Sequence, residues 1–305
     1  MPTISADDLY TVASELGLRI DRFETTRATD ADSIGNGNWL IWHDDQILVL
    51  RRYHVLHTET DLAYEAAVLR HLTDLGWSVP TPVTGSIRYG ERLWAVTRFV
   101  PGKPHQEESP EQIEERGALM ARLHADLAGL ELGQRQDFFR GADLEAMGAF
   151  QDWDPGLAAL RELSPELADW AALAMLEAKS AVAEGNLLDL PQTIVHGDFG
   201  SWNLHFEGDR LGGVIDFDLV HPDSRPWELV QARVNDGPGL IDGYQRAAAE
   251  LGNPLSEAEL AAIAPLQQVF RVNMVMAELW SGPRTGAFNL SMIERQLGLT
   301  GTAKP

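Results

Sequence analysis

The sequence VHGDFGSWNL, followed after a short turn by GGVIDFD, constrains the fold of this chain more than any other stretch. The apolar run Ile194–Val195 leads into a glycine-containing loop that carries Asp198 and Asn203, and a second apolar run, Val214–Ile215, ends at Asp216. Short apolar runs that end in polar residues predict a strand–loop–strand–turn–strand unit. We expect such a unit to bring the two acids and the amide to one edge.

These three side chains have the chemistry of a magnesium–phosphate site. Mg²⁺ takes few oxygen ligands from protein and fills its remaining positions with water and phosphate oxygens. Phosphoryl transfer needs metal ligands and a further carboxylate that orients the attacking hydroxyl, and general-base help of this kind contributes about 10²–10⁴ in rate. Asp, Asn and Gly also fill ordinary turns, but the complete spacing favours the site. We interpret His196 as a residue that braces the loop by hydrogen bonds.

The composition restricts the class of partner. Acidic residues outnumber basic ones by 46 to 24, for a net charge of −22, which argues against nucleic acid or an anionic membrane as partner. An acidic surface favours cationic small substrates or serves only solubility. The chain has no cysteine, so disulfides and thiolate metal sites are excluded. We recognise no signal peptide and no apolar run of about 18 residues, and we expect a cytoplasmic protein.

Two regions of different texture follow each other along the chain. Residues 1–100 indicate antiparallel strands around one helix, with hairpin turns at Asp44–Asp45 and around Gly90 and a capping box at Thr58 that opens the helix. After a joint that contains proline and glycine, the pattern becomes helical. Helices of this second region are expected to begin at Ser109, Ser164 and Ser256. We therefore predict an N-terminal lobe, 1–100, and a C-terminal lobe, 101–305.

The stretch VHGDFGSWNL…GGVIDFD resembles the catalytic signature of the aminoglycoside phosphotransferase/choline kinase-like family. The resemblance implies an α+β, two-lobed protein-kinase-like fold, with a small antiparallel sheet lobe that contains one helix and a larger, mostly helical lobe. It makes Asp198 the catalytic aspartate, Asn203 and Asp216 the metal ligands, and Asp218, where the kinase D-F-G motif has glycine, a secondary metal candidate. Glu228 resembles an acid that steadies the catalytic loop, or it is a helix-start acid.

The same resemblance assigns nucleotide-binding roles to the N-terminal lobe. The kinase pattern asks for a base on the third strand that pairs with a glutamate on the helix. Arg51 or Arg52 offers the base, with the stretch VLR favouring Arg51, and Glu65 is its natural partner. Strand alternation puts Val49 on the same face as Arg51, where it can touch the adenine. An arginine binds phosphate differently from a lysine, and both charged residues can alternatively be solvated surface groups.

Backbone groups complete the expected nucleotide site. Gly35 and Gly37, in SIGNGN between the first two strands, let backbone N–H groups approach phosphate oxygens, although Asn-Gly is equally a hairpin turn. The segment TRFVPG resembles the hinge, where the backbone near Phe99 and Val100 binds the base.

Several residues are interpreted as structural. His124 lies on the apolar stripe of its helix, so we expect a packed histidine. Trp202, Trp227 and Trp280 can form the wall of an acceptor site, but core packing is the preferred interpretation for each of them.

The function that follows is transfer of the γ-phosphate of magnesium-bound ATP or GTP to a hydroxyl of a small molecule. The negative net charge suggests an amine-bearing alcohol or an amino sugar. The alternative, motivated by the missing strand lysine, is a non-catalytic nucleotide-binding regulator with a kinase-like fold. A protein kinase is less favoured, because no activation segment of the usual length lies between Asp216 and Pro226. The sequence leaves the acceptor, the choice of nucleotide and the oligomeric state open.

Overall fold

The chain folds into two compact units that do not follow a single boundary along the sequence. The computed structural model describes residues 4–27, 36–136, 138–150, 152–232 and 239–299. The first unit comprises residues 1–108, 129–136 and 196–220, and the second comprises 109–128, 137–195 and 221–305. The segment with Asp198, Asn203 and Asp216 therefore belongs to the same unit as the N-terminal strands.

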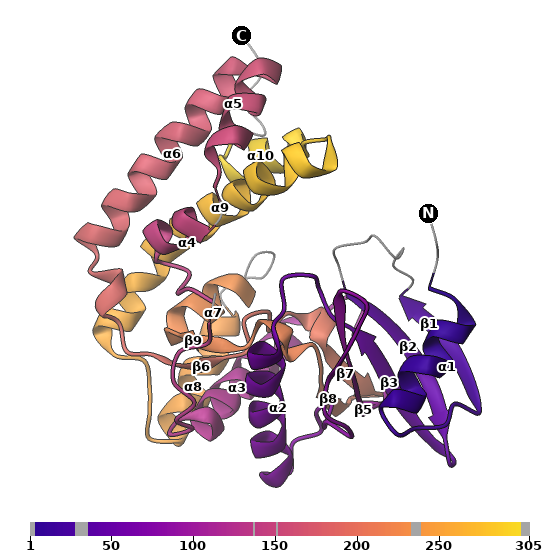
Figure 1. The fold of residues 1–305 in the computed structure, drawn as a ribbon. Helices are drawn as coiled ribbons and strands as arrows, with labels where there is room; N and C mark the ends of the chain where they lie inside the picture. Colours follow the sequence, from indigo (N-terminus) through magenta and orange to yellow (C-terminus); the bar gives the residue numbers. More distant parts are fainter. Residues whose placement is uncertain (1–3, 28–35, 137, 151, 233–238, 300–305) are drawn as a thin grey trace. The chain divides into compact units, whose positions relative to one another are not determined.

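A five-stranded antiparallel sheet is the centre of the first unit (Figure 1). Its strands, in the spatial order β1-β2-β3-β5-β4, are β1 Arg22–Arg27, β2 Gly37–His43, β3 Gln46–Arg52, β5 Arg92–Arg98 and β4 Ile87–Tyr89. Both expected hairpin turns are confirmed: β2 and β3 meet at Asp44 and Asp45, with φ of 45° and 63°, and β4 and β5 meet at Gly90, with φ of 61°.

One face of this sheet is packed by a helix that the sequence analysis missed. Helix α1, Ala6–Glu15, buries Leu9 and Val12 in one cluster with Trp39, Leu48 and other sheet residues. The prediction of a single helix in the first hundred residues was therefore wrong. Ser5 and Asp8 form a capping box of the same kind as Thr58 and Asp61, and this signal was overlooked.

The opposite face of the sheet carries the candidate nucleotide-binding side chains. Cα pairing sets Leu40 opposite Val49 and Asn38 opposite Arg51, so the period-2 alternation of strands places Val49 and Arg51 on one face, as expected. The expected helix is α2, Glu59–Asp74, whose capping box at Thr58 is confirmed and which buries Glu65.

Two short antiparallel strand pairs accompany the catalytic segment: one encloses it in sequence, and the other lies between Asn203 and Asp216. In the second unit, β6 (Thr193–Val195) pairs with β9 (His221–Asp223); in the first unit, β7 (Leu204–Glu207) pairs with β8 (Arg210–Val214). Strand β9 was not predicted, because HPD contains a proline and too few β-branched residues to indicate a strand.

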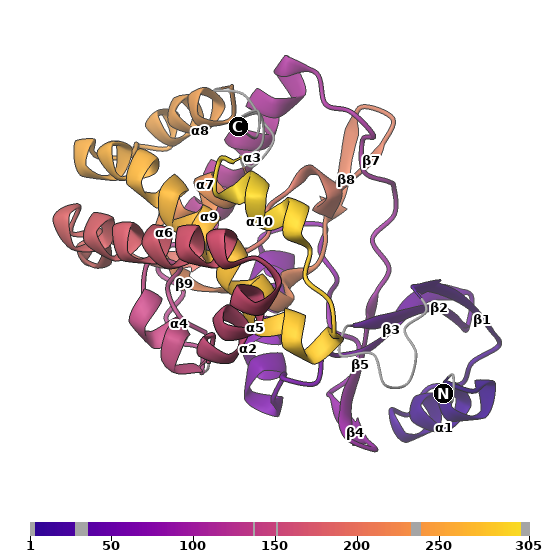
Figure 2. The ribbon, with the colours of Figure 1, turned by 90° about the horizontal axis from the view of Figure 1, so that it is seen from above.

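The second unit is mostly helical. Its helices are α3 Pro110–Leu127, α4 Leu144–Phe150, α5 Asp154–Leu163, α6 Pro165–Glu184, α7 Arg225–Ala232, α8 Gly239–Glu250, α9 Glu257–Thr285 and α10 Leu290–Gln296. The expected starts at Ser109, Ser164 and Ser256 are confirmed. Helices α5, α6, α9 and α10 pack together (Figure 2). Helices α3 and α8 approach so closely that only glycine fits at two positions. A Cβ on Gly117 would lie 2.0 Å from the Leu240 carbonyl oxygen, and a Cβ on Gly243 would lie 2.0 Å from the Glu114 carbonyl oxygen.

Helix α9 is the one helix among the described residues that is long and apolar enough to cross a membrane. The sequence analysis, which recognised no apolar run of about 18 residues, therefore overlooked this helix. Leu266, Val269, Met276 and Leu279 of α9 are buried in the core of the helical unit, and this burial accounts for its apolar sequence.

Candidate active site

The loop after β6 is built around His196 and Gly197. The Nε2 of His196 donates to the carbonyl oxygen of Ile215 at 2.9 Å, and its Nδ1 accepts from the backbone N–H of Asp198 at 3.2 Å. Gly197 has a φ of 84°, and a Cβ there would lie 2.4 Å from the Leu219 carbonyl oxygen, so only glycine fits. His196 therefore braces the loop, as expected, and ties it to the end of β8.

Asp198 receives two side-chain hydrogen bonds on the same oxygen. The Nδ2 of Asn203 donates to Asp198 Oδ2 at 2.9 Å and to its carbonyl oxygen at 2.8 Å, and the indole Nε1 of Trp202 donates to Oδ2 at 3.1 Å. Burial raises the pKa of Asp198, against the effect of these hydrogen bonds. The carboxylate is thus held in one orientation with Oδ1 left to accept a proton.

The role of Trp202 differs from the expectation. It is 49% exposed, whereas Trp227 is 4% exposed and Trp280 is partly buried against the helical core. Core packing therefore holds for Trp227 and Trp280 but was wrong for Trp202, because its position in the loop directs the indole to the Asp198 carboxylate instead of the core.

Arg51 bridges the two aspartates of the IDFD segment. An NH2 group of Arg51 lies 2.7 Å from Asp216 Oδ1 and 3.0 Å from Asp218 Oδ2. Burial tends to raise the pKa of both carboxyl groups. For Asp216 the nearby Arg51 guanidinium outweighs burial and the pKa is lowered, whereas for Asp218 burial prevails and the pKa is raised. Asp216 also has a φ of 66°, a left-handed conformation that is sparsely populated by residues other than glycine and that often marks functional sites.

Asn36 is a site residue that the sequence analysis did not identify. Its Nδ2 donates to Asp218 Oδ2 at 2.6 Å, and its Oδ1 accepts from the His54 N–H at 2.6 Å. The signal was its position in SIGNGN, which we had interpreted only through the glycines. Gly37 begins β2, and Gly35 lies outside the described residues.

Glu65 lies beside this network without an ion pair to Arg51. Its Oε1 accepts from the Tyr53 hydroxyl at 3.4 Å, and its Oε2 has no hydrogen-bond partner in the described part of the chain. Burial raises the pKa of Glu65 to about 7, although the nearby Arg51 charge acts in the opposite direction. The anticipated Arg51–Glu65 pairing is replaced here, since the guanidinium group lies against the two aspartates.

A cavity of about 240 Å³ joins the candidate residues within the first unit. Six residues predicted for nucleotide or metal binding line it: Val49, Arg51, Glu65, Phe99, Val100 and Asp216. Apolar side chains that sequence reasoning did not assign to this site also line it: Leu40, Pro80, Ile215 and Phe217. A largely apolar cavity with a few convergent polar groups is the usual form of a small-molecule site.

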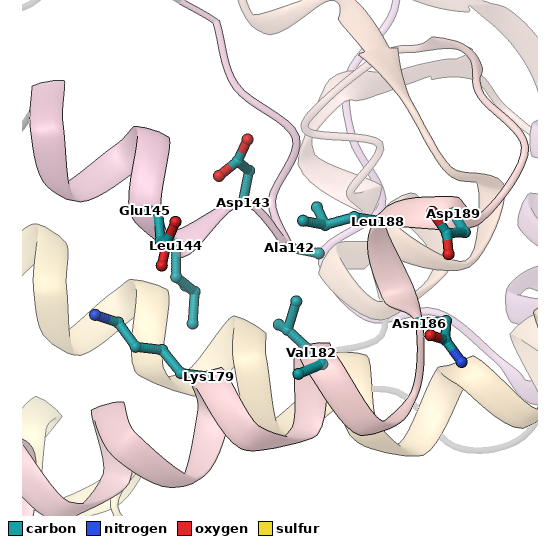
Figure 3. Close-up of a pocket in the computed structure, with 10 residues that line it drawn as sticks. Ala142, Asp143, Leu144, Glu145, Lys179, Val182, Asn186, Leu188 and Asp189 are labelled. Atoms are coloured by element: carbon teal, nitrogen blue, oxygen red, sulfur yellow. The ribbon is translucent and has the colours of Figure 1, made fainter.

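The helical unit has a separate cavity of about 330 Å³ between α4, α6 and the 3₁₀ turn Leu187–Asp189. In Figure 3, Leu144, Val182 and Leu188 extend into the space, while Lys179 and Glu145 lie to one side. No residue predicted for catalysis, nucleotide binding or metal binding lines this cavity.

His124 is part of a buried network in the helical unit. Its Nε2 lies 2.6 Å from Glu228 Oε2, and its Nδ1 lies 2.9 Å from the Tyr244 hydroxyl oxygen. The packed histidine is therefore confirmed. Glu228 is fully buried and binds a histidine that the sequence analysis did not pair with it.

The donor atoms fit a magnesium ion better than a transition metal. Among the described residues, no group of three or more His, Cys, Asp or Glu side chains has the arrangement of a metal site. Asp216 and Asp218 offer carboxylate oxygens, and Asn203 offers its Oδ1, because its Nδ2 is engaged by Asp198. A small set of oxygen donors is typical of Mg²⁺, which keeps several waters and phosphate oxygens.

Comparison with known proteins defines the class of the chain. Residues 29–263 match the model of the phosphotransferase enzyme family, so the chain belongs to this family. It is a small-molecule kinase with an alcohol group as acceptor. The resemblance to aminoglycoside phosphotransferases and the kinase-like fold, both expected from the sequence, are confirmed.

Individual relatives are more distant. The chain is 25% identical over 279 residues to a homoserine kinase from Parvibaculum lavamentivorans, covering 82% of this chain and 78% of the relative. It is 27% identical over 301 residues to a homoserine kinase from Brucella anthropi, covering 90% of this chain and 86% of the relative.

Among solved structures, a microcompartment-associated aminopropanol kinase has a TM-score of 0.69 at 15% identity, with 97% of this chain and 94% of that chain covered. A spectinomycin phosphotransferase in complex with ADP and spectinomycin has a TM-score of 0.64 at 11% identity, with 99% and 95% covered.

Proposed function

We propose that this kinase transfers the γ-phosphate of magnesium-bound ATP or GTP to the hydroxyl of a small amino alcohol, with homoserine as the first acceptor to test. The observation that carries the proposal is a set of two hydrogen-bonded pairs, Asn203 with Asp198 and Arg51 with Asp216. The backbone of Ile215 connects them, because its N–H donates to the Asn203 carbonyl oxygen directly before Asp216, and the second pair lines a cavity with the candidate nucleotide residues. The names of the relatives, homoserine kinase and aminopropanol kinase, denote enzymes for amine-bearing alcohols. The net charge of −22 favours such cationic groups.

Asp198 is the proposed general base. Its Oδ2 is engaged by Asn203 and Trp202, so Oδ1 is the atom that accepts the hydroxyl proton of the acceptor. The two hydrogen bonds fix the carboxylate before substrate binds, which lowers the entropic part of the barrier. Its raised pKa makes it a stronger base than an exposed aspartate.

Asn203 Oδ1 and the carboxylates of Asp216 and Asp218 are the atoms proposed to hold Mg²⁺. The bound ion neutralises charge on the transferring phosphate. Arg51 also supplies positive charge to both aspartates. When the nucleotide binds, we expect this guanidinium group to bind its phosphates, a role that suits its planar fork.

The nucleotide base is proposed to lie in the 240 Å³ cavity. Leu40 and Val49 from the sheet and Ile215 and Phe217 from the IDFD segment offer apolar surfaces for the base. At the hinge, the Val100 carbonyl accepts from His205 Nδ1 at 3.1 Å. The Val100 N–H has no hydrogen-bond partner within the described part of the chain and is the donor proposed for the base.

The non-catalytic nucleotide-binding regulator stays the second candidate. The observation that favours it is the pairing of Arg51 with both candidate metal ligands, because this ion pair competes with Mg²⁺ for the same carboxylates.

A kinase assay with matched acceptors decides between these functions. The purified chain is assayed with ATP or GTP, with and without Mg²⁺, against homoserine, 1-amino-2-propanol, kanamycin and 1,4-butanediol, the last as an alcohol without an amine. We expect magnesium-dependent phosphate transfer to an amine-bearing acceptor, a loss of about 10²–10⁴ in kcat for Asp198→Asn, and no transfer to the diol. Nucleotide binding without transfer to any acceptor would support the regulator instead.

A further inference from the structure

Arg135 is a buried cation in a segment, residues 129–136, that belongs to the first unit although its neighbours in sequence belong to the second. Its side chain is 0% exposed. Neither the sequence analysis nor the proposed chemistry assigns it a role. A buried guanidinium needs a counter-charge and hydrogen-bond acceptors, so its partners show which parts of the unit it joins.

The first partner is the N-terminal turn of α2. The Nε of Arg135 lies 3.1 Å from Asp61 Oδ1, and Asp61 is 2% exposed. The other carboxylate oxygen of Asp61 accepts from the Thr58 N–H at 2.8 Å and from its hydroxyl at 2.7 Å, closing the capping box. Glu65 follows Asp61 by four residues and therefore lies one turn further on the same side of the helix.

The second partner is the backbone of the IDFD segment. The NH1 of Arg135 donates to the carbonyl oxygen of Asp218 at 2.8 Å and to that of Val220 at 2.7 Å. These carbonyls lie within and just after the 3₁₀ turn Phe217–Leu219, which follows Asp216 in its left-handed conformation. One guanidinium thus holds the residues directly after the strained aspartate.

We propose that Arg135 is a positioning residue for the metal-binding segment: it fixes the backbone around Asp218 to the capped end of α2. The inference rests on the proposed function, because it assumes that Asp216 and Asp218 receive the metal. The hydrogen bonds join Arg135 to the backbone around Asp218, and its positive charge also favours the ionised Asp218 carboxylate. Arginine suits the role, since its planar fork satisfies one carboxylate and two carbonyls at once, whereas lysine carries a single ammonium group.

The helical unit contains a matched control of the same construction. Glu259 is the capping-box acid of α9, and Arg225 pairs with both of its carboxylate oxygens at 2.9 and 2.7 Å. Arg225 NH1 also donates to the carbonyl oxygen of Asn253 at 2.8 Å. This arginine therefore anchors a capped helix and a loop carbonyl without contacting the IDFD segment in the contacts described.

The experiment compares Arg135→Gln and Arg135→Lys with Arg225→Gln and Arg225→Lys. Thermal unfolding gives stability, and calorimetric titration with a non-hydrolysable ATP analogue, with and without Mg²⁺, gives the factor by which magnesium strengthens nucleotide binding. We expect Arg135→Gln to reduce this factor at least tenfold while metal-free nucleotide affinity changes less than twofold, and Arg135→Lys to lie between it and the unaltered chain. The Arg225 variants are expected to lower the melting temperature and to keep the magnesium factor.

Each outcome separates the two proposals. If the unaltered chain shows no magnesium-dependent nucleotide binding, the proposed function fails and the role of Arg135 fails with it. If the unaltered chain shows it and the folded Arg135 variants retain it, only the positioning role is overturned. Should Arg135→Gln fail to fold, the magnesium factor of Arg135→Lys decides: a value equal to that of the unaltered chain overturns the role.

Discussion

Two buried clusters, one in each unit, hold their polar groups in different ways. In the helical unit, His124 uses both ring nitrogens, and Glu259 uses both carboxylate oxygens. In the sheet unit, Arg51 shares one nitrogen between two aspartates, and one oxygen of Glu65 has no hydrogen-bond partner among the described residues. The first arrangement is saturated, and the second still has atoms that can bind a ligand.

This difference indicates where stability and where function reside. A saturated buried network contributes mainly to the fold, because removing one member leaves a buried charge or hydrogen-bonding group unpaired. A cluster with close carboxylates, a left-handed aspartate and an unpartnered oxygen is costly to maintain, and such costs concentrate at functional sites. Substitutions in the two clusters should therefore affect different measurements.

The largest effect is expected for Asp216→Asn. Loss of a carboxylate from the proposed metal site should lower kcat/KM at least 10³-fold, equivalent to about 4 kcal/mol in transition-state free energy. Asparagine tolerates the left-handed conformation of Asp216, so the melting temperature should stay within a few degrees. Steady-state kinetics and thermal unfolding of the same sample test both parts, and retained activity would contradict the metal role.

His124→Ala should show the reverse pattern. It leaves Glu228 fully buried without its histidine and should lower the free energy of unfolding by about 3 kcal/mol. Denaturant unfolding measures this loss. The folded variant should keep the magnesium dependence of the unaltered chain; if it loses that dependence without a loss of stability, the two networks are not functionally distinct.

Glu65 gives the sheet unit a pH-dependent stability. Its pKa is raised from 4.5 to about 7 in the folded chain, so between these values the folded state binds more protons than the unfolded state. The unfolding free energy therefore falls as pH rises from about 4.5 to about 7, by at most about 3 kcal/mol. Glu65→Gln should remove this fall, measured by chemical denaturation at several pH values.

The exposed Glu59 on the same helix supplies the control for Glu65. Glu59→Gln should leave the pH profile of the unaltered chain in place. If both glutamine variants have the same profile as the unaltered chain, burial of Glu65 is not the source of the effect.

The smallest effect concerns backbone strain that has no proposed function. Asp45 has a φ of 63° in the β2–β3 turn, and Asp-Gly is a favoured pair for such two-residue turns. Asp45→Gly should raise the free energy of unfolding by about 0.5–1 kcal/mol without changing kcat. A loss of stability would show that the Asp45 side chain contributes more than its backbone conformation costs.

The predictable part of the molecule was local. The capping box at Thr58, the helix start at Ser256 and the turn at Asp44–Asp45 were identified because their signals lie within four residues. Helix α1 was missed although Ser5 and Asp8 form the same kind of capping pair as Thr58 and Asp61. Trp202 was misassigned because composition says nothing about which partner an indole N–H will find.

The sequence by itself determined that a region rich in strands precedes a helical one, and which polar residues follow β6 and β8. It also determined that Val49 and Arg51 share one face, because strand alternation is a property of the local backbone. Only the tertiary structure decided that Arg51 pairs with Asp216, 165 positions away in the chain, that Asn36 binds Asp218 and that Arg135 joins α2 to the IDFD segment. Such pairings depend on how distant segments pack, and on which acceptor a buried charge then meets.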